Sequence, residues 1–403
     1  MKRGSDKRIK VFHIITKLEL GGAQRVTLQT LSSLNRELFS PGLVTSSQGM
    51  LLGEALQIDG LQVFLVPSMI REISPVRDLI ALLKIWKILR SEKVNIAHTH
   101  CSKAGVLGRW AAYLAGVPIR IHSVHGFAFS GFLPRRQRWL YLLMEKLNSR
   151  ITTHFFVDSR ANAEQGKRHR LFRRDNYSQV TPGIPLSQFA EAKVDVEGER
   201  KRLGISPNEK VVGMIACFKP QKAPLDFIRL AGKVVERLPE ARFLLVGDGE
   251  LRGEIERLVR KLGLEGRVIL TGWRWGIPRI IAMCEVMVLT SLWEGMPTVL
   301  PMAHAMRKPV VATRVDGNAE VIRDGKDGFL VPPRNPEAMS EKVIYLLQHP
   351  ESARQMGERG YQEVGKYDYP LMVSRLEELY RQLIDRSNLC FPLKAKRGTP
   401  PPG

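Results

Sequence analysis

Short apolar runs alternate with longer amphipathic runs along the 403 residues, and they do so in two separate series. The short runs are rich in β-branched residues and predict buried strands, whereas apolar positions three or four residues apart predict helices. A parallel pair of strands needs a crossover connection, usually a helix, so the alternation predicts parallel sheets covered by helices on both faces. The predicted fold class is α/β, with two Rossmann-like, doubly wound parallel-sheet domains.

The first series predicts strands near residues 9–15, 42–45, 61–66, 94–98, 118–124 and 153–157, with helices ending near 34 and over 76–91, 103–115 and 135–148. The second series predicts strands near 211–216, 241–246, 267–271, 286–290, 309–313 and 328–331. The pattern breaks at a Pro/Gly turn near 181–185, and a polar stretch follows it. We therefore expect an N-terminal domain over 1–188, a linker over 189–209, a C-terminal domain over 210–366, a final helix over 367–387 and a disordered tail over 388–403.

Composition narrows the class of protein. The chain is 44% hydrophobic and 25% charged, and no apolar run is long enough to span a bilayer, which predicts a cytoplasmic protein without integral membrane segments. The four cysteines are far apart and form no CxxC pair or Cys/His cluster, so neither a disulfide framework nor a zinc site is expected.

The formal charge of +22 is concentrated in the first half, because residues 1–190 hold 28 Lys/Arg against 12 Asp/Glu, a net +16. This excess either serves solubility alone or attracts an anionic partner. The chain has no zinc-finger spacing, RNP-type strand or basic heptad helix, so a nucleic-acid partner is not expected. An anionic membrane surface is the better candidate, which makes a peripheral position on the membrane possible.

The chemistry is concentrated between residues 291 and 333. A predicted strand ends near 290, and Pro297 is expected to stand at the start of a helix, where a missing N–H costs nothing. The free backbone N–H groups of such a helix can bind a phosphate, and Gly295 lets a ligand approach closely. Glu294 would repel phosphate, so we expect it to accept hydrogen bonds from sugar hydroxyls. Taken alone, this short motif equally fits a capped helix start.

The block resembles the signature of the retaining GT-B glycosyltransferases of family 4, typified by bacterial mannosyl- and glucosyltransferases. The positions that match are Ser291, Glu294, Gly295, Pro297, Pro309, Val310, Val311, Glu320, Asp324, Gly325, Gly328, Leu330, Val331, Pro332 and Pro333. The resemblance continues through the Gly21-Gly22 loop, the turn at 182–184, the loop at 218–222 and the turn at 247–249. The segment 98–129 resembles a subgroup acting in exopolysaccharide, capsule or other surface-glycan assembly.

The resemblance implies two domains that face each other across a cleft, with a C-terminal helix crossing back to the N-terminal domain. It also implies the role of each site residue. The catalytic pair is His125, facing the transferred sugar, and Glu294, holding its hydroxyls. The donor-binding residues are Gly21, Gly22, Lys219, Lys222, Trp273, Arg274, Gly295, Met296, Pro297, Thr298 and Met302, and the acceptor-binding residues are Lys103 and Arg109.

The chain departs from the family pattern at several of these places. Met302 stands where an acidic residue of the family usually binds the ribose hydroxyls. Cys217 stands where an arginine usually precedes the phosphate-binding lysine, and Lys219 is the candidate that would replace this charge. The usual E-A-M-A run reads 302–305 MAHA, and the turn before 309–311 is Met306-Arg307. These changes keep open a catalytically degenerate GT-B protein that only binds partners. A UDP-sugar epimerase shares the architecture but fits the block at 291–333 poorly.

The expected reaction needs neither a metal nor another cofactor. No D-x-D triplet occurs in the sequence, so charge on the leaving diphosphate would be met by helix N-termini and Lys222. The resemblance implies retention of anomeric configuration. A UDP-sugar is the favoured donor, and the acceptor is expected to be a glycan or a polyprenyl-diphosphate-linked glycan bound by the basic N-terminal domain. The segment 127–147 is either a packed helix with a basic edge or a membrane contact.

Overall fold

The computed structural model describes residues 8–127, 129, 131–173 and 175–387 of the chain. Within these residues the strands are β1 (Ile9–Ile14), β2 (Phe39–Thr45), β3 (Gln62–Leu65), β4 (Ile96–His100), β5 (Ile119–Val124), β6 (His154–Val157), β7 (Tyr177–Gln179), β8 (Lys210–Ile215), β9 (Ala241–Val246), β10 (Val268–Leu270), β11 (Val286–Leu289), β12 (Val310–Thr313) and β13 (Gly328–Val331).

The helices of the described residues are α1 (Gly22–Ser33), α2 (Leu52–Leu56), α3 (Pro75–Ser91), α4 (Ser102–Leu114), α5 (Arg135–Ser149), α6 (Arg160–Arg168), α7 (Leu186–Ala190), α8 (Val196–Arg202), α9 (Pro224–Arg237), α10 (Arg252–Lys261), α11 (Ile277–Met283), α12 (Val299–Ala305), α13 (Asn318–Val321), α14 (Pro336–Gln348), α15 (Pro350–Glu363) and α16 (Tyr369–Arg386). Two short 3-10 helices are η1 (Pro220–Lys222) and η2 (Val364–Tyr367).

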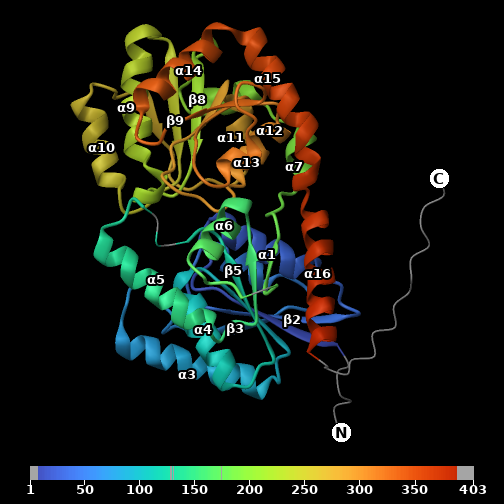
Figure 1. The fold of residues 1–403 in the computed structure, drawn as a ribbon. Helices are drawn as coiled ribbons and strands as arrows, with labels where there is room; N and C mark the ends of the chain where they lie inside the picture. The colour runs from blue at the N-terminus through green and yellow to red at the C-terminus, as the bar shows by residue number, and fades with distance from the viewer. Residues whose placement is uncertain (1–7, 128, 130, 174, 388–403) are drawn as a thin grey trace, which may run out of the picture.

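The strands form one sheet in each half of the molecule (Figure 1). The N-terminal sheet has the order β3-β2-β1-β4-β5-β6-β7, and the C-terminal sheet has the order β10-β9-β8-β11-β12-β13. All paired strands in both sheets run parallel. In each sheet the order reverses at the first strand, beside which doubly wound domains bind their ligands. The predicted fold class is confirmed.

The final helix joins the two halves. It leaves the C-terminal domain and runs along the N-terminal sheet, drawn in red in Figure 1. Its inner face packs on Ile9, Val11, Ile96, Ile121 and Phe156 of that sheet, through the buried side chains Met372, Val373, Leu376, Leu379, Tyr380 and Ile384. The expectation that a C-terminal helix crosses back is therefore confirmed.

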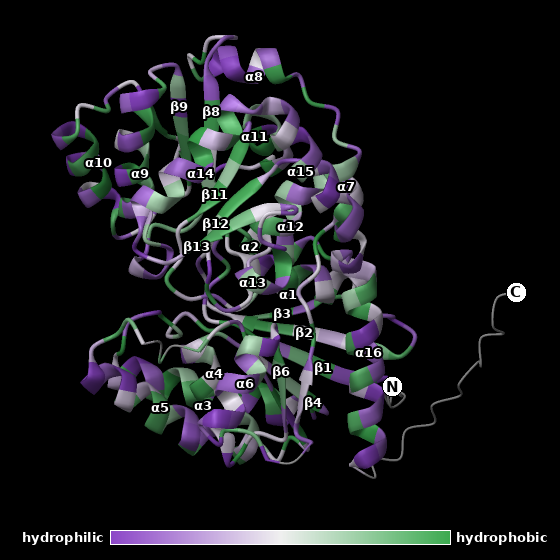
Figure 2. Ribbon diagram, turned by 45° about the horizontal axis from the view of Figure 1, so that its top comes forward, coloured by the Kyte–Doolittle hydropathy of each residue, from purple (hydrophilic) through white to green (hydrophobic). Residues whose placement is uncertain are grey.

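Apolar strands form the centre of each domain, which Figure 2 shows most clearly as green ribbon in β11 and β12. The continuous apolar sequences of these strands reflect a position between two layers of helices. Across the part of the chain that the structure describes, no helix is both long and apolar enough to cross a membrane.

Several local predictions differ from the structure. Strand β2 begins at Phe39 rather than near residue 42, because the Pro41-Gly42 pair that reads as a turn lies inside the strand. Strand β7 was not predicted, and its three residues are too few to give a pattern. The polar linker holds helix α8, whose cap is Asp195. The tail 388–403, predicted to be disordered, lies outside the described residues.

Candidate active site

The two domains meet where two loops follow the carboxyl ends of β5 and β11. Gly126 follows β5 and has a φ of +105°, a conformation that favours glycine. Gly295 follows β11, and a Cβ atom built on it would lie 2.6 Å from the carbonyl carbon of His125. A Cβ on Gly126 would likewise lie 3.1 Å from the backbone nitrogen of Gly295. Glycine at both positions therefore lets the backbones of the two domains touch beside His125 and Glu294.

Glu294 is held firmly at this junction although it is charged and only 5% exposed. Its Oε1 accepts a hydrogen bond from the Ser291 hydroxyl at 2.5 Å and pairs with the ammonium group of Lys222. Its backbone N–H donates to Oδ2 of Asp316 at 2.9 Å. Burial raises the pKa of Asp316, and the charge of Glu294 acts in the same direction. The arrangement places a lysine and a carboxylate, the two groups expected to bind phosphate and sugar, in direct contact.

The loop that carries Lys222 is held by hydrogen bonds to residues that directly follow β11. The Thr290 hydroxyl contacts the carbonyl oxygens of Lys222 and Ala223, at 2.7 and 3.0 Å. The Gln221 side-chain amide donates to the Trp293 carbonyl at 3.0 Å. Ala223 has a φ of +44°, a left-handed conformation that costs energy for a residue with a Cβ and that marks functional loops. The hydrogen bonds hold this strained turn so that Lys222 reaches Glu294.

His125 lies on the opposite side of the junction, with 17% of its side chain exposed. Its Nδ1 is 2.9 Å from Oδ2 of Asp158, and its Nε2 is 3.1 Å from Nδ1 of His100. Burial acts to lower the pKa of His125, but the adjacent Asp158 carboxylate outweighs it and raises that pKa above the usual value. Sequence reasoning missed Asp158 and His100. The signals that could have found them are the H-x-H triplet at 98–100 and an aspartate directly after β6.

The remaining predicted donor-binding residues lie around this junction in different ways. Gly22 faces the start of α12, because a Cβ on it would lie 3.2 Å from the Thr298 hydroxyl. Met296 is buried in the C-terminal core, and Pro297 is buried beside it. The helix begins at Val299 rather than near Pro297, so the predicted helix start is corrected by two residues. Gly21 precedes α1 as its N-cap.

Trp273 and Arg274 occupy the segment between β10 and α11. Trp273 is half-buried and Arg274 is exposed. The Gly247–Gly272 bridge anchors this segment to the loop after β9. The described contacts do not join the two residues to Glu294, so their expected contact with the nucleotide base stays a prediction.

The two predicted acceptor-binding residues, Lys103 and Arg109, differ in burial and in the partners that they contact. Lys103 starts α4 and pairs with Asp78 of α3 at 2.6 Å, near the surface. Arg109 is fully buried, and its guanidinium donates to the Gly105 carbonyl at 2.7 Å and pairs with Glu145 of α5 at 3.2 Å. A side chain enclosed in this way cannot contact an acceptor, so the expectation for Arg109 is wrong. Its role is to fasten α5 to α4.

A cavity of about 350 Å³ opens beside the junction. It is bounded by Phe127 and Phe132 of the N-terminal domain and by Trp293, Arg314 and Asp316 of the C-terminal domain. Walls from both domains, with a carboxyl and a guanidinium among aromatic rings, suit a sugar better than an apolar ligand. A larger cavity of about 640 Å³ lies between α6, β7 and α16, away from Glu294.

Residues 21–183 match the family model described as glycosyl transferase 4-like domain, and residues 195–363 match the model described as glycosyl transferases group 1. The chain is 34% identical over 332 residues to UDP-Gal:α-D-GlcNAc-diphosphoundecaprenol α-1,3-galactosyltransferase of Escherichia coli, across 82% of this chain and 85% of that enzyme. The chain belongs to the group 1 glycosyltransferases. It is therefore a nucleotide-sugar glycosyltransferase.

Other relatives of this group 1 glycosyltransferase extend the likeness over nearly the full length. Capsular polysaccharide biosynthesis glycosyltransferase CapM of Staphylococcus aureus is 24% identical across 94% of this chain and 99% of its own. The structure of HepE of Anabaena in complex with UDP-glucose superposes with a TM-score of 0.80, at 18% identity, over 93% of this chain and 100% of that one. These likenesses confirm the GT-B fold.

Two departures from the family pattern can now be placed in this glycosyltransferase. Met302 lies on α12 and packs, partly buried, against the C-terminal core. Cys217 precedes Lys219, whose charge reaches the opposite domain: burial raises the pKa of Cys101 to about 11, while Lys219 acts to lower it. Lys219 therefore lies close enough to Cys101 of the N-terminal domain for its charge to act there, and its expected substitution for the missing arginine charge stays a prediction.

Proposed function

We propose that this glycosyltransferase moves a sugar from a UDP-sugar to a polyprenyl-diphosphate-linked glycan, with retention and without a metal ion, in the synthesis of a bacterial surface polysaccharide. The observation that carries the proposal is the contact between Lys222 and Glu294, directly beside the backbone of His125 and Gly126. It joins a phosphate-binding cation, a sugar-binding carboxylate and the opposite domain at one point.

The donor's charges fit the two members of this pair. A diphosphate accepts hydrogen bonds from the Lys222 ammonium, and sugar hydroxyls donate to the Glu294 carboxylate. The Ser291 hydroxyl and the Asp316 carboxyl keep Glu294 in place when donor binding replaces Lys222 with sugar hydroxyls as the partner of its carboxylate. Negative charge grows on the diphosphate as the glycosidic bond breaks, and Lys222, with Lys219 nearby, stabilises it. UDP is favoured because the galactosyltransferase relative uses UDP-Gal by name.

The acceptor class rests on the same relative, whose name gives GlcNAc-diphosphoundecaprenol as its acceptor. Such a lipid stays in the membrane, so the enzyme has to bind the membrane surface. Helices α3, α4 and α5 lie side by side on the N-terminal domain (Figure 1) and expose many large apolar side chains. They are Val76, Leu79, Ile80, Leu83, Tyr113, Leu114, Trp139, Leu140, Tyr141, Leu143, Met144 and Leu147.

The same surface is basic. Arg135, Arg136, Arg138 and Lys146 are exposed on α5, of which only Asn148 is buried. Exposed apolar side chains among arginines and lysines are typical of a helix that lies in the interface of an anionic membrane. We call these exposed faces of α3, α4 and α5 the apolar-basic surface, and we propose that it contacts the membrane that holds the acceptor.

The experiment that tests the function offers UDP-galactose, UDP-glucose, UDP-N-acetylglucosamine and GDP-mannose, each radiolabelled, with a polyprenyl-diphosphate-GlcNAc acceptor. We expect one UDP-sugar to label the lipid, an α-linked product by NMR, and the same rate with EDTA present. Epimerised free donor would instead support an epimerase. Complete lack of turnover with every donor, in protein that still binds UDP, would support a degenerate enzyme.

A further inference from the structure

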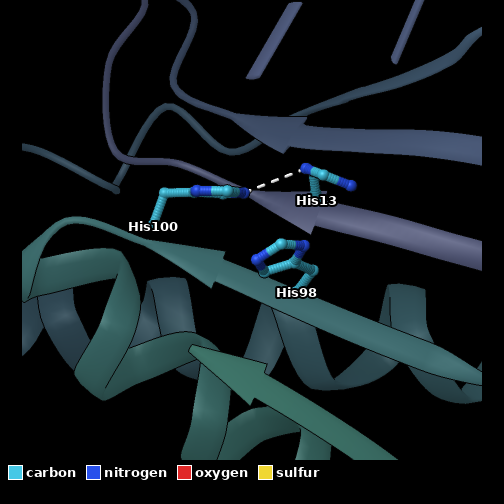
Figure 3. A group of neighbouring side chains, drawn as sticks. All are labelled: His13, His98 and His100. Atoms are coloured by element: carbon cyan, nitrogen blue, oxygen red, sulfur yellow. Dashed lines mark hydrogen bonds between the residues drawn. The ribbon is translucent and has the colours of Figure 1, made fainter. Parts of the chain in front are cut away.

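Buried histidines connect the active-site junction with the returning helix. His13 lies on β1, and His98 and His100 lie on the neighbouring strand β4, where His13 and His98 are paired in register. Figure 3 shows the three rings facing one another between the strands, with a hydrogen bond joining His13 and His100. All three are nearly or fully buried. One ring nitrogen of each histidine lies within 4.8 Å of those of the other two, a spacing at which imidazoles can also bind a metal ion.

The hydrogen bonds account for every ring nitrogen of these three side chains. Nδ1 of His13 is 2.9 Å from Nε2 of His100, and Nε2 of His13 is 3.0 Å from the Tyr380 hydroxyl. Nδ1 of His98 is 2.6 Å from the same hydroxyl, and Nε2 of His98 is 2.7 Å from the Ser123 hydroxyl. Nδ1 of His100 is 3.1 Å from Nε2 of His125. No nitrogen of the group is left for an ion, so the cluster is a hydrogen-bonded chain and not a metal centre.

The direction of the chain follows from its end at Asp158. An ionised carboxylate only accepts hydrogen bonds, so Nδ1 of His125 carries a proton and Nε2 of a neutral His125 accepts. His100 must then donate from Nδ1 and accept at Nε2 from Nδ1–H of His13. Each donor fixes the tautomer of the next imidazole. Burial lowers the pKa of His13 to about 3 and those of His98 and His100 well below the usual value, so these rings are neutral.

Tyr380 completes the same order. Nε2 of His13 needs a donor, and the Tyr380 hydroxyl supplies it. The hydroxyl oxygen in turn accepts from Nδ1–H of His98, whose Nε2 accepts from the Ser123 hydroxyl. Above the folded pKa of His125, every donor and every acceptor in this chain therefore has one partner, with all four rings as neutral Nδ1–H tautomers. Tyr380 is fully buried, and burial raises the pKa of its hydroxyl well above the usual value, so it keeps its proton.

We propose that Tyr380 of α16 is a positioning residue for catalysis, which fixes the tautomer and orientation of His125 through His13 and His100. Helix α16 continues directly from the C-terminal domain, so the chain links the arrangement of the two domains to the histidine at their junction. His125 in turn places its own carbonyl group and Gly126 against Gly295. This inference rests on the proposed place of His125 in the active site.

The test replaces Tyr380 by phenylalanine, which keeps the ring and removes the hydroxyl. We expect kcat to fall by about 10- to 100-fold, the range caused by a displaced active-site group, with the KM for the donor changed by less than about twofold. The control is Tyr367→Phe, which removes another buried tyrosine hydroxyl, 3.4 Å from the Glu320 carbonyl and outside the chain. An equal effect of the two substitutions on kcat would overturn the proposal.

A double-mutant cycle separates positioning from general loss of structure. If Tyr380 acts through His125, then Tyr380→Phe should have almost no further effect on kcat in a His125→Gln background. Additive effects on kcat would show that Tyr380 acts by another route.

A readout that does not depend on activity is the imidazole ¹⁵N spectrum of histidine-labelled protein. At a pH above the folded pKa of His125, Nδ1–H tautomers are expected for His13, His98, His100 and His125. The His13 signal should change in Tyr380→Phe but not in Tyr367→Phe. Unchanged His13 and His125 signals would refute the positioning role even if the transferase activity itself were confirmed. Stoichiometric metal in the purified protein, bound by these histidines, would refute the hydrogen-bonded chain.

Discussion

At the scale of single residues, the site consists of charged side chains that are buried or half-buried and paired with one another. Glu294 has the Ser291 hydroxyl and Lys222 as partners, and a buried charge without such partners would be strongly destabilising. The same side chains that stabilise Glu294 are those expected to act on the donor. Function and local stability therefore depend on the same few contacts.

Replacing Glu294 by glutamine tests that role. The substitution keeps the size of the side chain but removes the charge that pairs with Lys222. We expect kcat/KM to fall on the order of 10- to 100-fold, as for a lost hydrogen bond to a charged group of about 1.5–3 kcal/mol. The control is Glu285→Gln at the opposite end of β11, where the carboxylate pairs with Arg200 at 2.5 Å. If both substitutions reduced turnover equally, Glu294 would have no special role in the reaction.

The buried histidines make stability depend on pH. The pKa of His13 is lowered from 6.5 to about 3 in the folded protein, so below pH 6.5 the unfolded chain binds a proton that the folded chain does not. The contribution of neutral His13 to the free energy of unfolding is therefore fully present above pH 6.5. It is lost as the pH falls from 6.5 toward 3, because protons bind only to the unfolded chain. The free energy of unfolding should drop by up to ~1.4 kcal/mol per pH unit for each such histidine.

Urea unfolding of the wild type and of His13→Gln at several pH values between about 4.5 and 7.5 measures this dependence. The variant is expected to have a shallower slope of unfolding free energy against pH. Identical slopes would contradict a neutral, buried His13. His125 acts in the opposite sense, because its pKa is raised: its contribution is complete below pH 6.5 and is lost as the pH rises through its folded pKa.

At the scale of elements, two chain segments cross side by side between the domains. The backbone N–H of Ile184 donates to the Tyr367 carbonyl at 2.8 Å, and the N–H of Tyr369 donates to the Ile184 carbonyl at 2.9 Å. Asp368 also accepts from the backbone N–H of Leu186 at 3.4 Å. The first crossing carries the chain into the C-terminal domain, and the second returns it through α16. These hydrogen bonds fix the two connecting segments, near residues 184 and 368, against each other between the domains.

Gly183 allows the two segments to approach, because a Cβ on it would lie 2.5 Å from Cα of Tyr369. Gly183→Ala should therefore lower the free energy of unfolding by about 1–3 kcal/mol, as overpacking usually does, and lower kcat as α16 shifts. Gly365→Ala is the control, since a Cβ there meets no atom within 4 Å. Thermal unfolding and initial rates of both variants measure the effect. A Gly183→Ala protein as stable and active as Gly365→Ala would show that the crossing tolerates displacement.

At the scale of the whole molecule, the proposed membrane contact of the apolar-basic surface can be tested separately from the chemistry at the active-site junction. Trp139 on α5 is 64% exposed and Leu143 is one turn farther along that helix. Replacing both by glutamate should weaken binding to anionic vesicles on the order of 10- to 100-fold, because apolar area and charge attraction are both lost. Leu262→Glu is a matched control in the C-terminal domain, where the leucine is 42% exposed.

Sedimentation with vesicles measures that binding. The wild type should bind anionic vesicles more strongly than neutral ones, and binding should decrease from about 0.05 M to about 0.5 M salt as the basic charges are screened. Equal recovery with neutral and anionic vesicles would refute the membrane contact. Activity on a water-soluble acceptor should be unchanged in the double variant, since neither residue contacts the junction.

The sequence by itself determined the fold class and the position of Glu294. Apolar periodicity is a local property, so the strands and the helices between them could be predicted, except where Pro41-Gly42 hides the start of β2 and where β7 is too short to give a pattern. Glu294 and Lys222 could be named because short motifs carry them.

Only the tertiary structure decided which residues act together. The sequence placed Arg109 at the acceptor, but the packing of α4 encloses it, and periodicity alone does not show that α5 covers this side of α4. Asp158 follows β6, His100 ends β4 and Tyr380 lies on α16, up to 280 residues apart. No local pattern shows that these side chains and His125 form one hydrogen-bonded chain. Their contacts arise from strand register and from the return of α16 onto the N-terminal sheet, which are properties of the folded chain.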